Sequence, residues 1–397
     1  MAHQLPVNLP IPDEAARQIS EALQQRITGR IEAAGGWLSF EDYMEAVLYE
    51  PGLGYYSAGA QKFGSGGDFV TAPEISAVFS RCLAGQVAAV LDSSPQGVVL
   101  ELGAGSGAMA ADMLAEFEAL DAMPAKYLIL EPSADLRERQ EVLISQRVPH
   151  LLNKVEWLDE LPDRRIKGVI VANEVVDALP LRLFAETPQG LMETGVVHGP
   201  DGFAFSDKPA DFTLHALISR LSAQVGGREN WPDTFRSEIR TSLDDWFAAV
   251  ADSLEYGAMI FVDYGAVRRE FYRGERANGT LQCFFRHRVH DDPFWYPGLQ
   301  DITGWVDFTQ LAENAVAAGL QVAGFSTQAQ FLLNAGVDQQ VNLAGAATPE
   351  EQAKLAAAVR KLMLPGEMGE VFKAMLFTTA GVETPPGFGG RDLRTSL

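Results

Sequence analysis

The sequence predicts an α/β fold built on a doubly wound sheet. Short apolar runs alternate with segments of helical periodicity, which is the order of strands and helices in a largely parallel sheet. Each run is a few residues long and ends in an acid or a turn, as strands buried on both faces do. A glycine-rich loop follows the first run, at the end of the strand where such sheets bind ligands. The runs are GVVLELG (97–103), KYLILEPS (126–133), KGVIVANE (167–174), GAMIFVDYG (257–265) and GEVFKAMLFTTA (369–380).

A helical and loop-rich region is expected before the sheet, over residues 1–90. Residues 40–50, FEDYMEAVLYE, have the apolar spacing of a short helix, which a Pro-Gly pair ends. Farther along, Thr71 is expected at the N-cap of a second helix, with Pro73 in its first turn. One face of this second helix carries the apolar residues Ile75, Val78, Phe79, Cys82 and Leu83.

The sheet domain is expected over residues 91–390, followed by a C-terminal tail over 391–397. An inserted module at about 182–250 interrupts the alternation of strands and helices. Its first part, 181–205, has the turn residues of β-hairpins, and residues 210–250 have a helical pattern. The insertion is either a substrate-facing module or a packed excursion, and the sequence leaves both interpretations open.

The composition indicates a soluble intracellular protein. The 397 residues carry a net charge of −22, which argues against a general nucleic-acid-binding surface. A basic protein segment would complement this charge, although an acidic surface also serves solubility. The two cysteines lie among apolar residues and form neither a disulfide framework nor a zinc site. With no long apolar core near the N-terminus and no membrane-spanning run, we expect a cytoplasmic protein that binds neither nucleic acid nor membrane.

The loop ELGAGSG contains Gly103, Gly105 and Gly107, and glycine lets a ligand approach the backbone closely. Dinucleotides, nucleoside triphosphates and S-adenosylmethionine all bind loops of this kind. A Walker loop is excluded, because no Gly-Lys-Ser/Thr follows at the required spacing. Gly103, Gly105 and Ala108 satisfy the permissive dinucleotide pattern, so that ligand stays open, as does a tight turn that binds nothing.

Two acids favour S-adenosylmethionine over a dinucleotide. Glu101 precedes the first glycine by two residues, where a negative charge suits a cationic ligand better than a pyrophosphate. Glu131 closes the second strand and lies 131 − 103 = 28 residues after Gly103, whereas the acid of a dinucleotide fold follows at about 20. A carboxylate there offers two oxygens to the ribose hydroxyls.

Three polar residues end the strand segment GVIVANEVVDALP: Asn173, Glu174 and Asp177. A buried strand that ends in polar groups often delivers them to a ligand site, and Asn173 is expected beside the cofactor. Glu174 and Asp177 are the candidate catalytic pair, because two carboxylates hold a guanidinium and orient it for methyl transfer. The alternative is that both acids cap the next helix.

Two further segments are candidates for the site. His290 and Asp291, in FFRHRVHDDPFWYPG, are expected to shape the acceptor pocket. Metal binding by this cluster is the less favoured alternative, since no third histidine or cysteine lies nearby, and we expect no metal. In GGDFVTAPE, the helix start at Thr71 and Pro73 could hold the carboxylate of S-adenosylmethionine, or be an ordinary cap.

Taken together and in order, these motifs resemble the MidA-like family of class I S-adenosylmethionine-dependent methyltransferases. The resemblance covers residues 36–378, which is most of the chain. It is carried by SFEDYMEAVLYEPGLGYYS, GGDFVTAPEIS, ELGAGSG, NEVVDALP, VDYG, the stretch from RHRVHDDP to DITGWVDF, and LPGEMGEVFKAML.

The resemblance implies a Rossmann-like class I methyltransferase sheet that binds S-adenosylmethionine at Gly103, Gly105 and Gly107, with Glu131 as the ribose-binding acid. It also implies a protein substrate, since family members methylate an arginine of a respiratory-complex subunit. The sequence lacks both the targeting segment of the mitochondrial members and the double-glutamate hairpin of the large arginine methyltransferase family. A non-catalytic assembly factor that binds S-adenosylmethionine and an NAD-dependent oxidoreductase are the alternatives.

Overall fold

The computed structural model describes residues 9–57, 70–94, 96–345 and 348–397. The chain divides into two compact units, each assembled from three separate segments. Unit 1 comprises Met1–Phe69, Val176–Leu243 and Val267–Trp305, and unit 2 comprises Val70–Val175, Asp244–Ala266 and Val306–Leu397. This division differs from the expected boundaries at 90 and at 182–250, because residues 70–89 pack on the sheet of unit 2 and residues 267–305 belong with the inserted hairpins.

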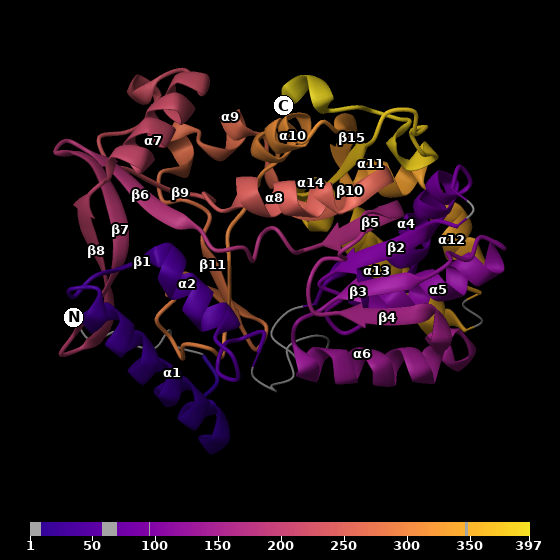
Figure 1. Ribbon diagram of the computed structural model, residues 1–397, viewed down its shortest axis with the longest axis horizontal. Helices are drawn as coiled ribbons and strands as arrows, with labels where there is room; N and C mark the ends of the chain where they lie inside the picture. The colour runs from indigo at the N-terminus through magenta and orange to yellow at the C-terminus, as the bar shows by residue number, and fades with distance from the viewer. Residues whose placement is uncertain (1–8, 58–69, 95, 346–347) are drawn as a thin grey trace. The chain divides into compact units, whose positions relative to one another are not determined.

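Unit 2 contains the predicted doubly wound sheet (Figure 1). In the described residues the sheet has eight strands, and their order along its main path is β15-β16-β10-β5-β2-β3-β4. Five consecutive strands of this path, β10, β5, β2, β3 and β4, are parallel to one another. Strand β16 is antiparallel to both of its neighbours, β10 and β15. The strands are β2 (Val98–Leu102), β3 (Tyr127–Leu130), β4 (Val155–Leu158), β5 (Ile166–Asn173), β10 (Leu254–Ala266), β14 (Val306–Asp307), β15 (Gln321–Thr327) and β16 (Phe372–Thr378).

All five apolar runs therefore contain a strand, and the α/β fold class is confirmed. The last run begins as the short helix α14 (Met368–Val371) before it enters β16. The strands β4 and β15 were not predicted from the sequence, because VEWL is short and Gln321–Thr327 mixes polar with apolar residues.

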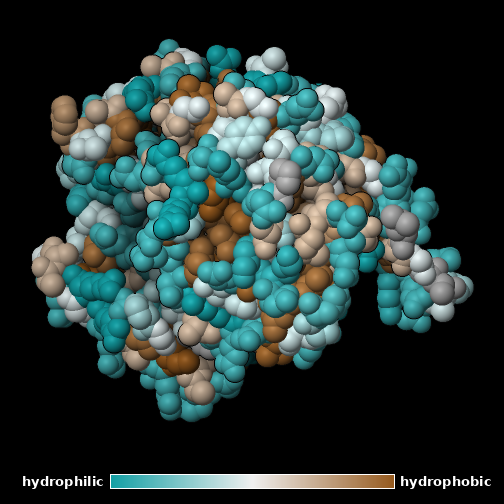
Figure 2. Space-filling view, turned by 45° about the vertical axis from the view of Figure 1, so that its right-hand side comes forward, coloured by the Kyte–Doolittle hydropathy of each residue, from teal (hydrophilic) through white to brown (hydrophobic). Residues whose placement is uncertain are grey.

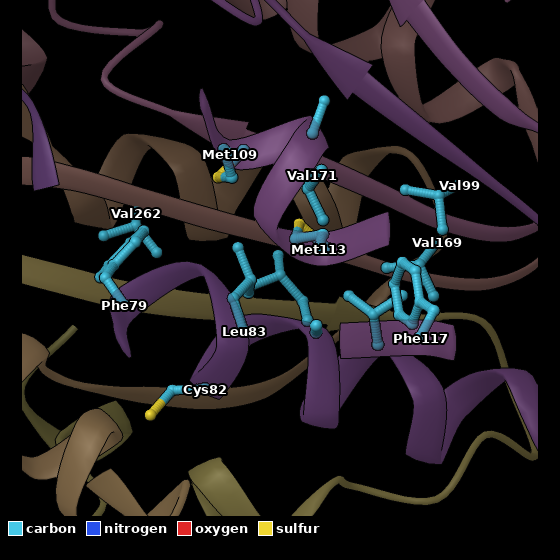
Figure 3. Packing of buried hydrophobic residues seen from close by; sticks show 14 of the residues in the cluster. Phe79, Cys82, Leu83, Val99, Met109, Met113, Phe117, Val169, Val171 and Val262 are labelled. Carbon is cyan, nitrogen blue, oxygen red and sulfur yellow. The ribbon is translucent and has the colours of Figure 1, made fainter. Parts of the chain in front are cut away.

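Helices cover both faces of this sheet. Besides α14, the α-helices of unit 2 are α3 (Ala72–Ile75), α4 (Ala77–Leu91), α5 (Ala108–Ala119), α6 (Ala134–Arg147), α8 (Leu243–Asp252), α10 (Phe308–Ala317), α11 (Gln328–Asn334), α12 (Val337–Leu343) and α13 (Pro349–Met363). Figure 3 shows α4 and α5 packed on one face, where Phe79, Leu83 and Met113 meet Val171 and Val262. Because successive strand residues point to opposite faces, Phe261 faces the other layer and packs against Phe247 of α8.

Unit 1 is built around an antiparallel sheet with the path β1-β7-β6-β9, and β8 pairs with β7. The predicted hairpins of the insertion are confirmed as β6, β7 and β8. Residues 210–250 are not wholly helical, since β9 interrupts them and pairs with β6. The elements of this sheet and its helices are α1 (Glu14–Ala33), β1 (Leu38–Ser39), α2 (Phe40–Tyr49), β6 (Arg182–Thr187), β7 (Gly190–Gly199), β8 (Gly202–Pro209), α7 (Phe212–Gln224), β9 (Phe235–Ile239) and α9 (Arg268–Phe271).

The core of unit 1 joins segments that are far apart in the sequence. Ile27 of α1 and Tyr43 of α2 pack with Val196 of β7. Cys283 and Ile302 join the same core from a three-stranded sheet of β11 (Gln282–Phe285), β12 (Arg288–His290) and β13 (Asp301–Thr303). The predicted helix over FEDYMEAVLYE is confirmed as α2, which Ser39 caps by accepting a hydrogen bond from the backbone N–H of Asp42.

Hydrophilic residues cover much of the face shown in Figure 2. In the part of the chain that the structure describes, no helix is long and apolar enough to cross a membrane.

Candidate functional site

The candidate cofactor site lies at the carboxyl ends of β2 and β5. These strands pair in parallel with Leu102 opposite Ala172, so the residues that follow them meet at one edge of the sheet. The winding of the sheet reverses here, since β3 lies on the far side of β2 and β10 on the far side of β5. Doubly wound sheets bind their ligands at this switch point.

The glycine loop runs directly from β2 into α5. Gly103, Gly105 and Gly107 have φ of +62°, +54° and +83°, which side chains with a Cβ rarely adopt. A Cβ on Gly107 would lie 3.1 Å from Cα of Gln140, and one on Gly103 would lie 3.4 Å from Cγ2 of Val175. The turn itself thus requires glycine at these positions, and it also leaves the backbone accessible for a ligand to approach.

Gln140 of α6 joins this loop to Glu131. Its Nε2 donates to the carbonyl oxygen of Gly105 at 3.0 Å and to Oε2 of Glu131 at 3.1 Å, and its Oε1 accepts from Trp157 Nε1 at 2.9 Å. Glu131 Oε1 accepts from the backbone N–H of Ser133 at 3.0 Å. A carboxylate has about four acceptor positions, which suits the paired hydroxyls of a ribose, so Glu131 stays the predicted ribose-binding acid.

Sequence reasoning missed Gln140. It is fully buried, yet it lies in a strongly polar helix, RERQEVLISQR, in which nothing distinguishes it from its neighbours. Only the folded chain places its amide between the loop carbonyl and the Glu131 carboxylate.

Glu101 is within β2 and is 1% exposed. Its Oε2 accepts a 2.6 Å hydrogen bond from the hydroxyl of Tyr127 on the neighbouring strand. The pKa of Glu101 is raised to about 7, mainly by burial and to a smaller extent by the charge of Glu131, with the Tyr127 hydrogen bond partly opposing the shift. The sequence interpretation placed this acid beside a ligand cation, and the structure gives it a buried position in the strand that leads into the loop.

Asn173 and Glu174 complete the switch point from β5. Glu174 has φ of +54°, an uncommon and strained conformation for a residue with a Cβ. Its Oε1 accepts from Asn173 Nδ2 at 3.2 Å and from the backbone N–H of Ala72 at 3.4 Å. Asn173 Oδ1 is buried, and no donor of the described residues reaches it. Residues 174–180 contain bends and a turn but no helix, so the alternative that Glu174 and Asp177 cap the next helix is wrong.

The segment around Thr71 and Pro73 differs from its prediction. The expected single helix is two helices, because the four-residue α3 ends at Ser76, which caps α4 instead. Thr71 makes no side-chain cap, and the first amide of α3 donates to Glu174. A helix this short has a weak dipole, and the preceding GGDF, residues 66–69, lies outside the described residues.

Asp177 belongs to unit 1, whereas Glu174 belongs to unit 2. Asp177 is 4% exposed, and its carbonyl accepts from Arg240 Nη2 at 2.6 Å. Arg240 also donates to the carbonyl oxygens of Leu179 and Gly304, so one buried guanidinium ties together two distant stretches of unit 1.

His290 and Asp291 lie in unit 1, where His290 is the last residue of β12 in a β11–β12 hairpin and Asp291 directly follows the strand. The turn of this hairpin has φ of +47° at Arg286 and +61° at His287, which are the signs required by a two-residue type I′ turn. Burial lowers the pKa of His290, although the charges of Asp292 and Asp291 oppose the shift, so its neutral form is favoured. Among the described residues, no group of three or more His, Cys, Asp or Glu is arranged to hold a metal ion.

This strand order, with the antiparallel strand β16 between β10 and β15 and a glycine loop after β2, defines a Rossmann-like S-adenosylmethionine-dependent methyltransferase. A family model described as "Putative S-adenosyl-L-methionine-dependent methyltransferase" matches residues 82–326. The chain belongs to this family, and the predicted MidA-like membership is confirmed.

Known proteins similar to this chain agree with that membership. A crystal structure from Burkholderia thailandensis bound to S-adenosyl-homocysteine is 41% identical, with a TM-score of 0.92, and the match covers 98% of this chain and 100% of that one. The protein arginine methyltransferase NDUFAF7, mitochondrial, of Danio rerio is 29% identical over 392 residues, covering 90% of this chain and 87% of the relative. Its Homo sapiens counterpart is 29% identical over 369 residues, covering 85% and 79%.

S-adenosylmethionine is therefore the cofactor, and the dinucleotide interpretation is rejected. The residues at the switch point fit this group. The loop has a backbone that only glycine readily adopts, Gln140 holds the Glu131 carboxylate beside that loop, and Asn173 Oδ1 is a buried acceptor with no donor among the described residues. None of the comparisons assigns roles to individual residues, so the site residues remain predictions.

Proposed function

We propose that this methyltransferase transfers its methyl group to an arginine side chain of a protein. The curated relatives that match most of the chain are named protein arginine methyltransferases. The net charge of −22 complements a basic substrate segment. The observation that carries the proposal is Glu174, a carboxylate held in a strained backbone conformation at the switch point where the cofactor loop also lies.

A guanidinium is a poor nucleophile because its charge is delocalised and its pKa is very high. S-adenosylmethionine supplies the electrophilic methyl group. A carboxylate at Glu174 holds the guanidinium by charge-assisted hydrogen bonds and fixes the orientation of the attacking nitrogen. As the nitrogen bonds to the methyl carbon, the methyl–sulfur bond would break and its electron pair would leave with S-adenosyl-homocysteine. The proton that the nitrogen loses would pass to Glu174 and then to solvent. Asp177 is proposed to contribute to the acceptor pocket because it matches the acidic segment of the family, and His290 and Asp291 because they belong to a polar cluster of the sequence.

The test uses the purified full chain and methyl-labelled S-adenosylmethionine, with protein extract from source cells that lack the gene. Hydrolysis of the labelled protein should release N-methylarginine. Glu174→Gln should slow labelling by about 100-fold or more while S-adenosyl-homocysteine affinity, measured by calorimetry, changes by less than about threefold.

Glu350→Gln, at an exposed acid of α13, is the matched control and should label at the wild-type rate. Label in another amino acid would contradict the arginine assignment. Tight S-adenosyl-homocysteine binding without any labelling would instead favour the non-catalytic assembly factor.

A further inference from the structure

Unit 1 contains a surface groove that lies wholly within that unit. Its volume is about 570 Å³, and it is lined by the end of α1, the start of α2, and residues of β6, β7 and β8. We name it the Trp37 groove, defined by Trp37, Glu41, Asp42, Arg182, Glu193, Lys208 and Asp211.

Trp37 provides an aromatic surface that already holds a cation. Its indole Nε1 donates to the carbonyl oxygen of Ser206 at 2.9 Å, which fixes the orientation of the ring. The ammonium of Lys208 lies 3.3 Å from a ring centroid of the indole, in the geometry of a cation–π contact. The groove can therefore accommodate an alkyl ammonium or guanidinium on this ring, and Lys208 occupies the position from within the chain.

The charges of the groove are unbalanced. Its lining has four carboxylates and two cations. Arg182 is committed to Glu193 at 2.8 Å and to Asp211 at 2.9 Å, while Lys208 is 4.0 Å from Glu193. The other two acids, Glu41 and Asp42 of α2, therefore lie outside these close ion pairs.

Neutral hydroxyl groups hold those two acids. Thr241 donates to Glu41 at 3.1 Å, and Ser39 donates to Asp42 at 2.6 Å. Burial raises the pKa of Glu41 despite the Thr241 hydrogen bond and the charge of Arg182. An added cation would offset the cost of that half-buried charge.

We propose that the Trp37 groove docks a basic peptide segment of the substrate protein. An arginine or lysine of the segment takes the place of Lys208 on the Trp37 ring, and its charge is balanced by Glu41 and Asp42. The proposal rests on the proposed function for its protein substrate. The groove holds that substrate by binding energy alone, so its residues do not take part in methyl transfer.

The experiment measures fluorescence anisotropy of a labelled peptide of alternating arginine and serine, titrated with the full chain at about 0.15 M salt. A peptide of alternating glutamine and serine is the uncharged control and should not bind. In the Lys208→Met background, where no cation of the chain occupies the ring, Trp37→Leu should weaken binding of the arginine peptide by about fivefold, the size of an exposed cation–π contact. Lys208→Met should strengthen it about threefold, because it exposes the ring.

Charge-matched variants separate the groove from the general acidity of the chain. Lys354→Met removes one positive charge from an exposed i,i+4 pair on α13, and Glu350→Gln removes one negative charge from the same pair. Each should change affinity by less than about 1.5-fold, whereas Glu41→Gln should weaken binding about threefold. Equal effects of Lys208→Met and Lys354→Met, or of Glu41→Gln and Glu350→Gln, would overturn the proposal.

Calorimetry with S-adenosyl-homocysteine on the same variants checks that each is folded and keeps its cofactor site. If the groove variants bind both the cofactor product and the arginine peptide as the wild type does, the groove assignment fails while the proposed function stands. If the wild type labels no arginine but the variants show the expected pattern of peptide affinities, the arginine assignment fails while the groove stands.

Discussion

The cofactor loop and the Trp37 groove are built in opposite ways. The loop is one contiguous stretch, Gly103–Gly107, and its predicted cofactor binding depends on backbone conformations that glycine permits. The groove combines Trp37 and the start of α2 with three strands that lie more than 140 residues farther along, and its function depends on side-chain charges and one indole ring. A site made by the backbone can be recognised in the sequence, whereas a site assembled from side chains of distant segments cannot.

The largest effect is expected from Gly107→Val, which attacks the backbone-built site. A β-branched residue at φ +83° costs about 1–3 kcal/mol of strain, and its Cβ would also press on Gln140 at 3.1 Å. S-adenosyl-homocysteine affinity should fall by about 100-fold or more in calorimetry.

Gly85→Ala is the control for Gly107→Val. Gly85 lies inside α4, and a Cβ there would meet nothing within 4 Å, so affinity should be unchanged and stability equal or higher. Wild-type affinity of Gly107→Val would show that the loop is not the cofactor site.

The same contrast explains how much could be predicted. Apolar runs and glycines are local signals, so the five strands, the loop and the acids at the end of β5 could be located from the sequence. The roles of Gln140 and Arg240 could not be predicted, because each acts through hydrogen bonds to partners that are distant in the sequence. Glu131 lies 9 positions from Gln140, and Gly304 lies 64 positions from Arg240. Strand β9 was missed for a similar reason, since its pairing with β6, rather than its own short pattern, places it in the sheet.

A smaller effect is expected from Gln140→Met, which tests whether the backbone-built site also needs a distant side chain. The variant keeps the volume and removes three hydrogen bonds, those donated to the Gly105 carbonyl and the Glu131 carboxylate and that accepted from Trp157. The two donated bonds, one neutral and one charge-assisted, are the ones that hold the site, and their loss corresponds to about 2 kcal/mol, so affinity for S-adenosyl-homocysteine should fall about 30-fold.

Gln330→Met, in α11, removes a comparable amide that donates to Asn334 at 2.9 Å and should leave that affinity unchanged. If both variants bind like the wild type, the cofactor site is as local as its sequence motif suggests, and Gln140 only fills space.

The last effect concerns Glu101, the buried acid beneath the loop, and it appears in the pH dependence of stability rather than in cofactor affinity. In the folded chain the pKa of Glu101 is raised to about 7, mainly by burial, whereas the unfolded chain has the ordinary value of 4.5. Between these values the folded state keeps the proton that the unfolded state has released, so the free energy of unfolding falls as pH rises from about 4.5 to about 7.

The variant Glu101→Gln does not titrate in this range, and Gln still accepts the Tyr127 hydrogen bond through its carbonyl oxygen. Urea unfolding at several pH values should therefore show the wild type losing stability relative to the variant across this window, with a constant difference above about pH 8. A constant difference from pH 4.5 upward would mean that Glu101 is already ionised in the folded chain, and its charge would then be available to a cationic ligand, as the sequence first suggested.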